Sequence, residues 1–226
     1  SHVWDKERIM LPDWDGIPTW ADGYDDFNLW MSLDWGTRSP SSLLLAYRTP
    51  VMTWWKGHRI GAGSLVLVDE VYTCLTSPDG TRQWNHGDRE LTTSKLAKAA
   101  KELCQRNGIS LERIPQRHRV ADAAIGAEIG SDDGSIGAQL KRHGAGFVAA
   151  PKGRRAPGWQ AMARLMEAAG DPFHPGLYAT PKVESFWATV PGVTYAAHDP
   201  EDLDTTQPDH VLDSCRYLIT ACLLYT

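Results

Sequence analysis

The fold is decided by three apolar stretches near the start of the chain: LWMSLDW (29–35), LLLAY (43–47) and LVLVDEVY (65–72). Each stretch is short, rich in aliphatic and aromatic residues and apolar on both faces, which is typical of a strand buried inside a sheet. The link between the first two, GTRSPSS (36–42), is short and turn-like, so we expect these two strands to pair antiparallel. The stretches therefore predict the central strands of a sheet.

Farther along the chain, helical and extended patterns alternate. TSKLAKAAKELCQR (93–106) places its apolar residues on one helical face and ends at Asn107-Gly108, a common helix stop. The later elements are predicted in the order strand, helix, strand, helix, helix: 119–123, 135–143, 146–150, 158–169, and 208 to about 224. Three antiparallel strands followed by strand–helix units predict a mixed α/β sheet flanked by helices. This is the order of an RNase H-like fold.

Composition limits the class of protein. The chain has 226 residues, of which 42% are hydrophobic and 23% charged, so a wholly disordered protein is excluded. No apolar run approaches the ~20 residues of a membrane span, and we expect no membrane contact. The net charge of -5 argues against a protein that coats polyanions, although an acidic metal site can offset a basic groove elsewhere. The cysteines form no CxxC pair and no phosphate-binding loop of the GxxxxGK type occurs, which argues against a zinc site and a P-loop ATPase.

The first 27 residues differ from the rest of the chain. They contain Pro12, Pro18 and several aspartates, and Trp4, Trp14 and Trp20 follow no periodic pattern. We expect the segment to pack through these aromatic side chains. We interpret 1–27 as a linker or arm, and 28–226 as the folded domain.

Carboxylates stand at the ends of three predicted strands. Asp34 lies near the end of the first, Asp122 at the end of RVADA (119–123), and Asp69 and Glu70 near the end of LVLVDEVY. An unpaired buried carboxylate costs several kcal/mol, and ligands of open α/β sheets collect at such strand ends. For Asp34 alone, a cap on the following turn is an equally good reading.

The last predicted helix carries Asp209 and Asp213, one turn apart. At 100° per residue, the apolar stripe of this helix is centred roughly 110° from Asp209 and roughly 150° from Asp213. Asp209 therefore borders the buried face, whereas we expect Asp213 to point further toward solvent. An alternative role for Asp209 is that of a helix N-cap.

Carboxylates from separate strands and one helix, meeting at one end of a sheet, would repel each other unless cations lay between them. Hard oxygen ligands suit Mg²⁺ or Mn²⁺, and two such ions can clamp the attacking and leaving oxygens of a phosphodiester. The pattern therefore predicts a two-metal site for phosphodiester hydrolysis.

Five pieces of the chain, in this order and spacing, resemble the nuclease domain of the large terminase subunits of tailed bacteriophages. They are SLDWG (32–36), VDEVY (68–72), RVADAAI (119–125), SIGAQLKRHG (135–144) and DHVLDSCRY (209–217). The last piece is the most specific, because the family typically ends its domain with a DHxxDAxRY-like helix. The resemblance covers roughly residues 28–224.

The resemblance implies an RNase H-like endonuclease that cuts concatemeric viral DNA at the start and end of genome packaging. It implies Asp34, Asp122 and Asp209 as the catalytic, metal-binding aspartates, Glu70 as an accessory and Asp213 as a carboxylate that supports them. The packaging ATPase of the complete family protein is absent from this sequence, so we expect the chain to be an excised C-terminal domain. The implied partners are double-stranded DNA, the ATPase domain, the small terminase subunit and the portal, in the host cytoplasm.

DNA must reach this acidic site. PKGRRAPG (151–158) is predicted to be an exposed basic loop that contacts phosphates, and the DNA-binding candidates around it are Lys141, Arg142, Lys152, Arg154 and Arg155. For any one of these residues, a solvated surface charge is equally well supported. His210, beside Asp209, is the histidine of most interest.

Two alternatives remain open from the sequence. Another RNase H-like nuclease, such as a resolvase or a transposase-like enzyme, would carry the same carboxylates. A non-catalytic module that docks on the portal or the motor would not cleave DNA at all.

Overall fold

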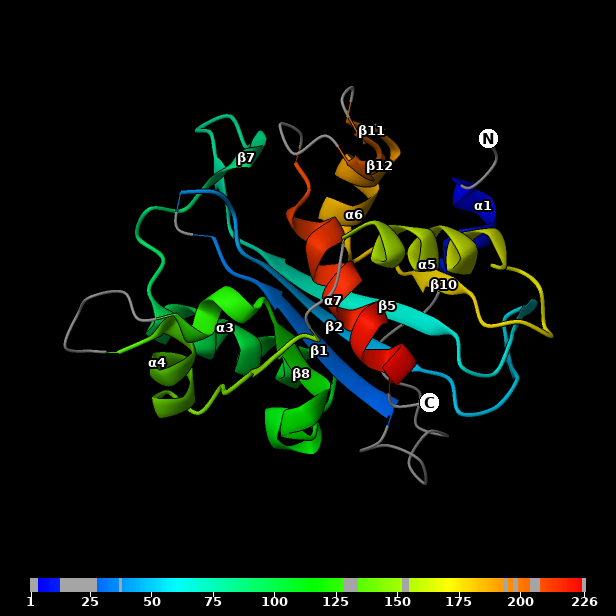
Figure 1. The fold of residues 1–226 in the computed structure, drawn as a ribbon, viewed down its shortest axis with the longest axis horizontal. Helices are drawn as coiled ribbons and strands as arrows, with labels where there is room; N and C mark the ends of the chain where they lie inside the picture. The colour runs from blue at the N-terminus through cyan, green and yellow to red at the C-terminus, as the bar shows by residue number, and fades with distance from the viewer. Residues whose placement is uncertain are drawn as a thin grey trace.

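The computed structural model describes residues 4–12, 28–36, 38–127, 134–151, 155–192, 195–196, 199–203 and 208–224. Within these ranges the centre is a six-stranded sheet in the order β10-β5-β2-β1-β8-β9 (Figure 1). Its strands are β1 (Leu29–Asp34), β2 (Ser42–Arg48), β5 (Leu65–Tyr72), β8 (Arg119–Ala121), β9 (Val148–Ala149) and β10 (Leu177–Ala179). β2 is antiparallel to both β1 and β5. β8 is parallel to β1, β9 is parallel to β8, and β10 is parallel to β5. The predicted mixed sheet is confirmed.

Helices cover both faces of this sheet (Figure 1). α7 (His210–Leu224) lies across one face, where Ser214 contacts Ser32 of β1. α3 (Thr93–Arg106) lies against the opposite face, where Arg106 contacts Asp69 of β5. Because the sheet is covered on both sides, every residue of β1 is buried, which is why its sequence shows no polar alternation.

The predicted helix over 93–106 is confirmed to the residue. The Thr92 hydroxyl accepts a hydrogen bond from the Lys95 amide at 3.2 Å and caps its start. Gly108, at φ +77°, follows the end of the helix. α4 (Ile136–Arg142) and α7 also begin and end within two residues of their predicted limits. None of the described helices is long and apolar enough to cross a bilayer.

The predicted loop over 151–158 is wrong from Arg155 onward, because α5 (Arg155–Glu167) starts there. Pro157 lies in the first turn of α5, where a missing backbone N–H leaves no helical hydrogen bond unmade. Gly158 faces α7 so closely that a Cβ atom would lie 2.5 Å from Cγ of Arg216. The Pro-Gly pair therefore permits close packing of two helices instead of forming a turn.

Shorter elements complete the described fold. The remaining helices and strands are α1 (Lys6–Ile9), α6 (Glu184–Thr189), β3 (Thr53–Trp55), β4 (His58–Ile60), β6 (Cys74–Thr76), β7 (Arg82–Gly87), β11 (Tyr195–Ala196) and β12 (Asp199–Leu203). Short 3₁₀ turns span Leu111–Arg113, Gln116–His118, Ala123–Gly126 and Val190–Gly192. β3 and β4 form a hairpin whose turn residues Lys56 and Gly57 both have positive φ, as a tight hairpin turn requires.

The N-terminal segment packs onto the domain where it is described. Ile9 and Leu11 are fully buried, and the Leu11 amide donates to the Ala179 carbonyl at 3.1 Å. The ring of Trp4 lies 5.6 Å from that of Phe186. The expected aromatic anchoring is confirmed for Trp4, while Trp14 and Trp20 lie outside the described residues.

Candidate active site

The strand register brings two of the predicted aspartates together. β1 and β8 run parallel with Leu33 opposite Ala121, so the next residues, Asp34 and Asp122, occupy adjacent positions at the same end of the sheet. Neighbouring strands lie about 4.8 Å apart. On the other side of β1, Asp34 is paired with Ser42, which is paired with Tyr72 of β5. These residues form one row on the face that α7 covers.

α7 adds Asp209 and His210 to this row. His210 Nδ1 lies 2.9 Å from Asp34 Oδ2, and Asp209 is buried at the start of the helix. The helix is held in place by Ser214, whose hydroxyl lies 2.9 Å from the Ser32 hydroxyl and donates to the Ser42 carbonyl at 3.2 Å. The structure thus brings Asp34, Asp122, Asp209 and His210 to one end of the sheet, and their role as a metal site stays a prediction.

The charges of these groups act on one another. Burial raises the pKa of Asp34; the His210 side chain opposes this, and the carboxylates of Asp209 and Asp122 raise the pKa further. Burial lowers the pKa of His210, but the hydrogen bond and charge of Asp34, together with the charges of Asp209 and Asp213, raise it overall. Asp34 and His210 thus form a buried, coupled pair next to two more carboxylates.

Each carboxylate of the group has a hydrogen-bond partner. The Asp122 carboxylate accepts from the Ala124 amide at 2.6 Å and from the Tyr217 hydroxyl at 2.5 Å. Arg155 Nη2 donates to Asp209 Oδ2 at 3.1 Å and to Asp213 Oδ2 at 3.2 Å. These bonds fix the side chains without a metal.

The oxygen donors suit Mg²⁺ or Mn²⁺ chemically. Among the residues that the structure describes, however, no three His, Cys, Asp or Glu side chains are placed to hold one ion together. Instead, Asp34, Asp122 and Asp209 contact His210, Tyr217 and Arg155 respectively. The chemistry of these oxygen donors still fits a divalent ion.

Asp213 is less exposed than the helical wheel predicts. Its side chain is only 15% exposed, because α5 packs against α7 and brings Arg155 to it. Arg216, one turn later on α7, donates its Nε to Asp213 Oδ1 at 3.0 Å. Burial raises the pKa of Asp213 to about 6, although both arginines oppose the shift. Asp213 is more exposed than Asp209, 15% against 11%, in the expected order, but α5 leaves little of its side chain open to solvent.

Glu70 lies on the same face as Asp34 but in a site of its own. Its carboxylate accepts from the Ser185 amide at 2.7 Å and from the Ser185 hydroxyl, both at the start of α6. Burial raises the pKa of Glu70 to about 7, against the opposing effect of these hydrogen bonds. In the structure, its direct partners are therefore Ser185 atoms.

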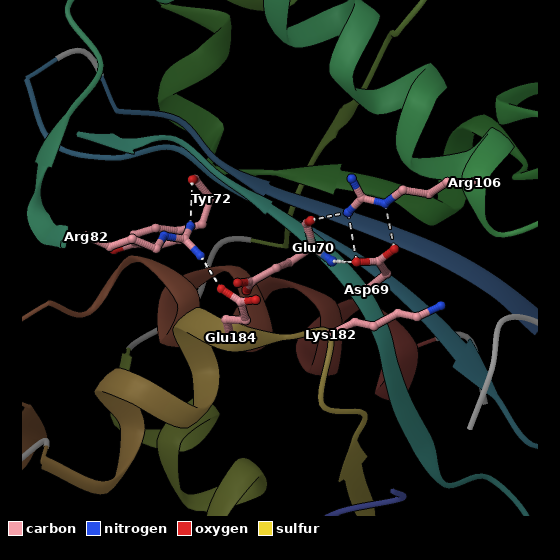
Figure 2. A pocket seen from close by; sticks show the side chains of 7 residues that line it. All are labelled: Asp69, Glu70, Tyr72, Arg82, Arg106, Lys182 and Glu184. Carbon is pink, nitrogen blue, oxygen red and sulfur yellow. Dashed lines mark hydrogen bonds and ion pairs between the residues drawn. The ribbon is translucent and has the colours of Figure 1, made fainter. Parts of the chain in front are cut away.

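Glu70 borders a cavity of about 410 Å³ at the edge of β5, shown in Figure 2. The cavity lies beyond the part of β5 that pairs with β10, which ends at Leu67. Arg106 donates to both oxygens of Asp69, at 2.7 and 2.8 Å, and to the Glu70 carbonyl at 2.5 Å. Arg82 donates to Glu184 at 2.7 Å and to the Tyr72 carbonyl at 3.2 Å. Side chains thus take up the outward backbone carbonyls of this edge.

The candidate DNA-binding residues are not gathered in one loop. Lys152 and Arg154 lie outside the described residues. Lys141 and Arg142 are exposed on the last turn of α4, whereas Arg155 is bound to the acidic pair of α7. Their DNA-binding role stays a prediction.

Arg155 and Tyr217 are neighbours of the acidic site that the strand-end pattern does not predict. Tyr217 follows Asp209 and Asp213 at intervals of four on α7, so helical spacing alone places the three on one face. For Arg155 no local signal exists, since its contact depends on how α5 packs against α7.

No family model matches this sequence, and no curated protein matches it either. Solved structures do resemble it. The large terminase of a thermophilic bacteriophage in complex with ADP aligns with a TM-score of 0.65 and 14% identity, over 98% of this chain and 44% of that one. The P22 large terminase nuclease domain aligns at 0.57 and 16%, over 95% and 87% of the two chains.

The nuclease domain of the large terminase from bacteriophage SPP1, solved with bound Mn, aligns at 0.50 and 15% identity, over 92% and 94% of the chains. This chain therefore spans less than half of the thermophilic phage protein and nearly all of the isolated nuclease domains. The chain has the RNase H-like fold of large-terminase nuclease domains.

Proposed function

We propose that the chain is an endonuclease domain of a viral terminase large subunit, which cuts concatemeric double-stranded DNA during genome packaging. The observation that carries this proposal is the position of Asp34 and Asp122 at adjacent strand ends, with Asp209 and His210 of the last helix beside them. Burial first, and then the charges of Asp209 and Asp122, raise the pKa of Asp34. The fold supports it, because the isolated domains that the chain resembles are nuclease domains.

The proposed cofactor is a pair of Mg²⁺ or Mn²⁺ ions held by Asp34, Asp122 and Asp209. Mutual repulsion among these carboxylates favours cation binding, and the SPP1 domain of the same fold was solved with Mn. When bound, two such ions activate a water molecule and stabilise the departing 3′ oxygen.

The chain's own residues position these ligands. His210 holds Asp34 through Oδ2, and the Tyr217 hydroxyl holds Asp122 through Oδ2. The Ser32–Ser214 contact fixes α7 against β1 and with it the position of Asp209. Asp213 supports Asp209 by sharing Arg155, and Glu70, whose carboxylate contacts Ser185, is proposed as an accessory.

The proposed partners follow from this function. Double-stranded DNA is the substrate, contacted by Lys141, Arg142, Lys152, Arg154 and Arg155 without reading of sequence. The ATPase domain of the large subunit, the small terminase subunit and the portal would complete the packaging assembly. Its place of action would be the cytoplasm of the host.

The test is cleavage of supercoiled plasmid DNA with Mn²⁺, with Mg²⁺ and with EDTA. Asp34→Asn, Asp122→Asn and Asp209→Asn should each reduce cleavage at least about 100-fold, because each removes one charge from a site that must hold cations. Asp79→Asn is the matched control, since it makes the same change at an exposed turn and should cleave like the parent chain.

Circular dichroism should show that the variants remain folded. Cleavage that persists in EDTA, or that survives in the three site variants, contradicts the proposal. Folded protein that binds portal or motor subunits but never cleaves DNA would favour the docking module instead. A marked preference for branched DNA junctions would favour a resolvase.

A further inference from the structure

Arg155 contacts two acidic side chains, Asp209 just before α7 and Asp213 on its first turn. Its Nη2 lies 3.1 Å from Asp209 Oδ2 and 3.2 Å from Asp213 Oδ2, and the two carboxylate side chains are only 11% and 15% exposed. Like charges one helical turn apart repel each other, and burial strengthens the repulsion because it reduces solvent screening. The guanidinium group supplies the counter-charge that lets both carboxylates sit there.

The position of Arg155 on its own helix does not favour a cation. It is the first residue of α5, and the N-terminal end of a helix carries a partial positive charge. The contact between Gly158 and Arg216 packs α5 against α7, and the guanidinium group lies 5.5 Å from the centre of the Trp159 ring. Arg155 is thus held by the acidic pair and by packing, against the field of its helix.

We propose that Arg155 is the resident counter-cation of the acidic site, and that a divalent ion must displace it from Asp209 in order to bind. This inference rests on the proposed function, since it takes Asp209 as a metal ligand. Arg155 is then a positioning residue that weakens metal binding in the free domain. Its contact with DNA would follow only after an ion has displaced it.

The displaced side chain has room beside the site. A cavity of about 290 Å³ lies next to it, lined among others by Asp122, Pro151, Arg155, Arg216 and Tyr217. A DNA phosphate that enters this cavity can take over as the partner of the guanidinium group, which pairs well with phosphate oxygens. Metal and DNA should therefore bind cooperatively, because each favours the same movement of Arg155.

The test measures Mn²⁺ binding by calorimetry on the whole chain without DNA. Arg155→Gln should bind Mn²⁺ about tenfold more tightly than the parent, because the ion no longer competes with a charge-assisted hydrogen bond. In EDTA the same variant should melt at a lower temperature, since Asp209 and Asp213 are left partly buried without their shared counter-charge. Added Mn²⁺ should restore more of its melting temperature than it adds to the parent.

Arg216→Gln is the matched control. Arg216 has the same charge and contacts Asp213, but none of its described bonds reaches Asp209. A smaller gain in this variant supports displacement, whereas equal gains in both variants would mean a general loss of positive charge and would overturn the inference. Unchanged Mn²⁺ affinity in Arg155→Gln would overturn it too.

Asp209→Asn separates this inference from the proposed function. Loss of Mn²⁺ binding in that variant, together with unchanged affinity in Arg155→Gln, refutes only the role of Arg155. Unaltered Mn²⁺ binding in Asp209→Asn refutes both. If Arg155→Gln does not fold, NMR of the arginine side chains in the parent chain during a Mg²⁺ titration replaces the variant. The Arg155 signal should shift as Mg²⁺ binds, and an unshifted signal overturns the proposal.

Discussion

Replacing Glu70 with Gln should stabilise the protein at neutral pH. The Glu70 side chain is buried, and burial raises its pKa from 4.5 to about 7. The folded chain therefore binds a proton more tightly than the unfolded chain. The contribution of protonated Glu70 to the free energy of unfolding is fully present below pH ~4.5, is lost as the pH rises to about 7, and stays lost above it. At about 1.4 kcal/mol per pH unit, the cost of ionising Glu70 in the folded state at pH 8 is about 3 kcal/mol.

The Gln variant avoids this cost and can keep both contacts with Ser185, by accepting from the amide and donating to the hydroxyl. Urea unfolding of both proteins at pH 5 and pH 8 measures the effect. We expect Glu70→Gln to be more stable by as much as about 3 kcal/mol at pH 8 and by much less at pH 5. The comparison between proteins cancels other groups that titrate, Asp213 among them. Equal stability at both pH values, or a less stable variant at pH 8, would refute the argument that Glu70 is ionised at a cost. Lost cleavage in a stabilised variant would, in addition, confirm its accessory role.

Three further predictions concern the rest of the site. Asp34→Asn in EDTA at pH 8 should melt at the same temperature as the parent or higher, because burial and two neighbouring carboxylates disfavour the ionised form of Asp34. A clear drop of the melting temperature in a thermal scan would mean that the His210 contact outweighs these effects. Ser32→Ala should lower the free energy of unfolding by about 1–2 kcal/mol, since it leaves the buried Ser214 hydroxyl with one partner fewer. An unchanged free energy in urea unfolding would show that this contact does not hold α7 in place. Reversing the charges of Lys152 and Arg154 should weaken DNA binding for all sequences and flatten its dependence on salt, so an unchanged salt slope in fluorescence anisotropy would place the DNA path elsewhere.

The sequence predicts what depends on local patterns. β1, β2 and β5 are mostly apolar stretches, and α3 has both a periodic face and a glycine stop, so their limits follow from short-range signals. β10 has three residues, and it is defined by its pairing with β5, a part of the chain far away in sequence. No local pattern could identify it.

The same division holds for the site. That Asp34 and Asp122 lie near each other follows from a rule of topology, because the ends of neighbouring parallel strands meet at one edge of a sheet. A helical wheel describes one helix only, so it does not predict how far α5, which brings Arg155 from another part of the chain, covers Asp213. Glu70 was grouped with the aspartates by strand position, and only the structure shows its contact with Ser185.

The edge of β5 described above bears on how copies of this domain behave when crowded together. Unpaired strand edges recruit strands from other molecules and start aggregates. Beyond Leu67 the edge offers little to recruit: the Thr180 hydroxyl binds the Val68 carbonyl, the Asp69 carboxylate binds the Glu70 amide, and Arg106 and Arg82 bind the next outward carbonyls. An incoming strand would have to remove bonded, charged side chains before making its first backbone contact. Copies of the domain can therefore lie close together without pairing through this edge of β5.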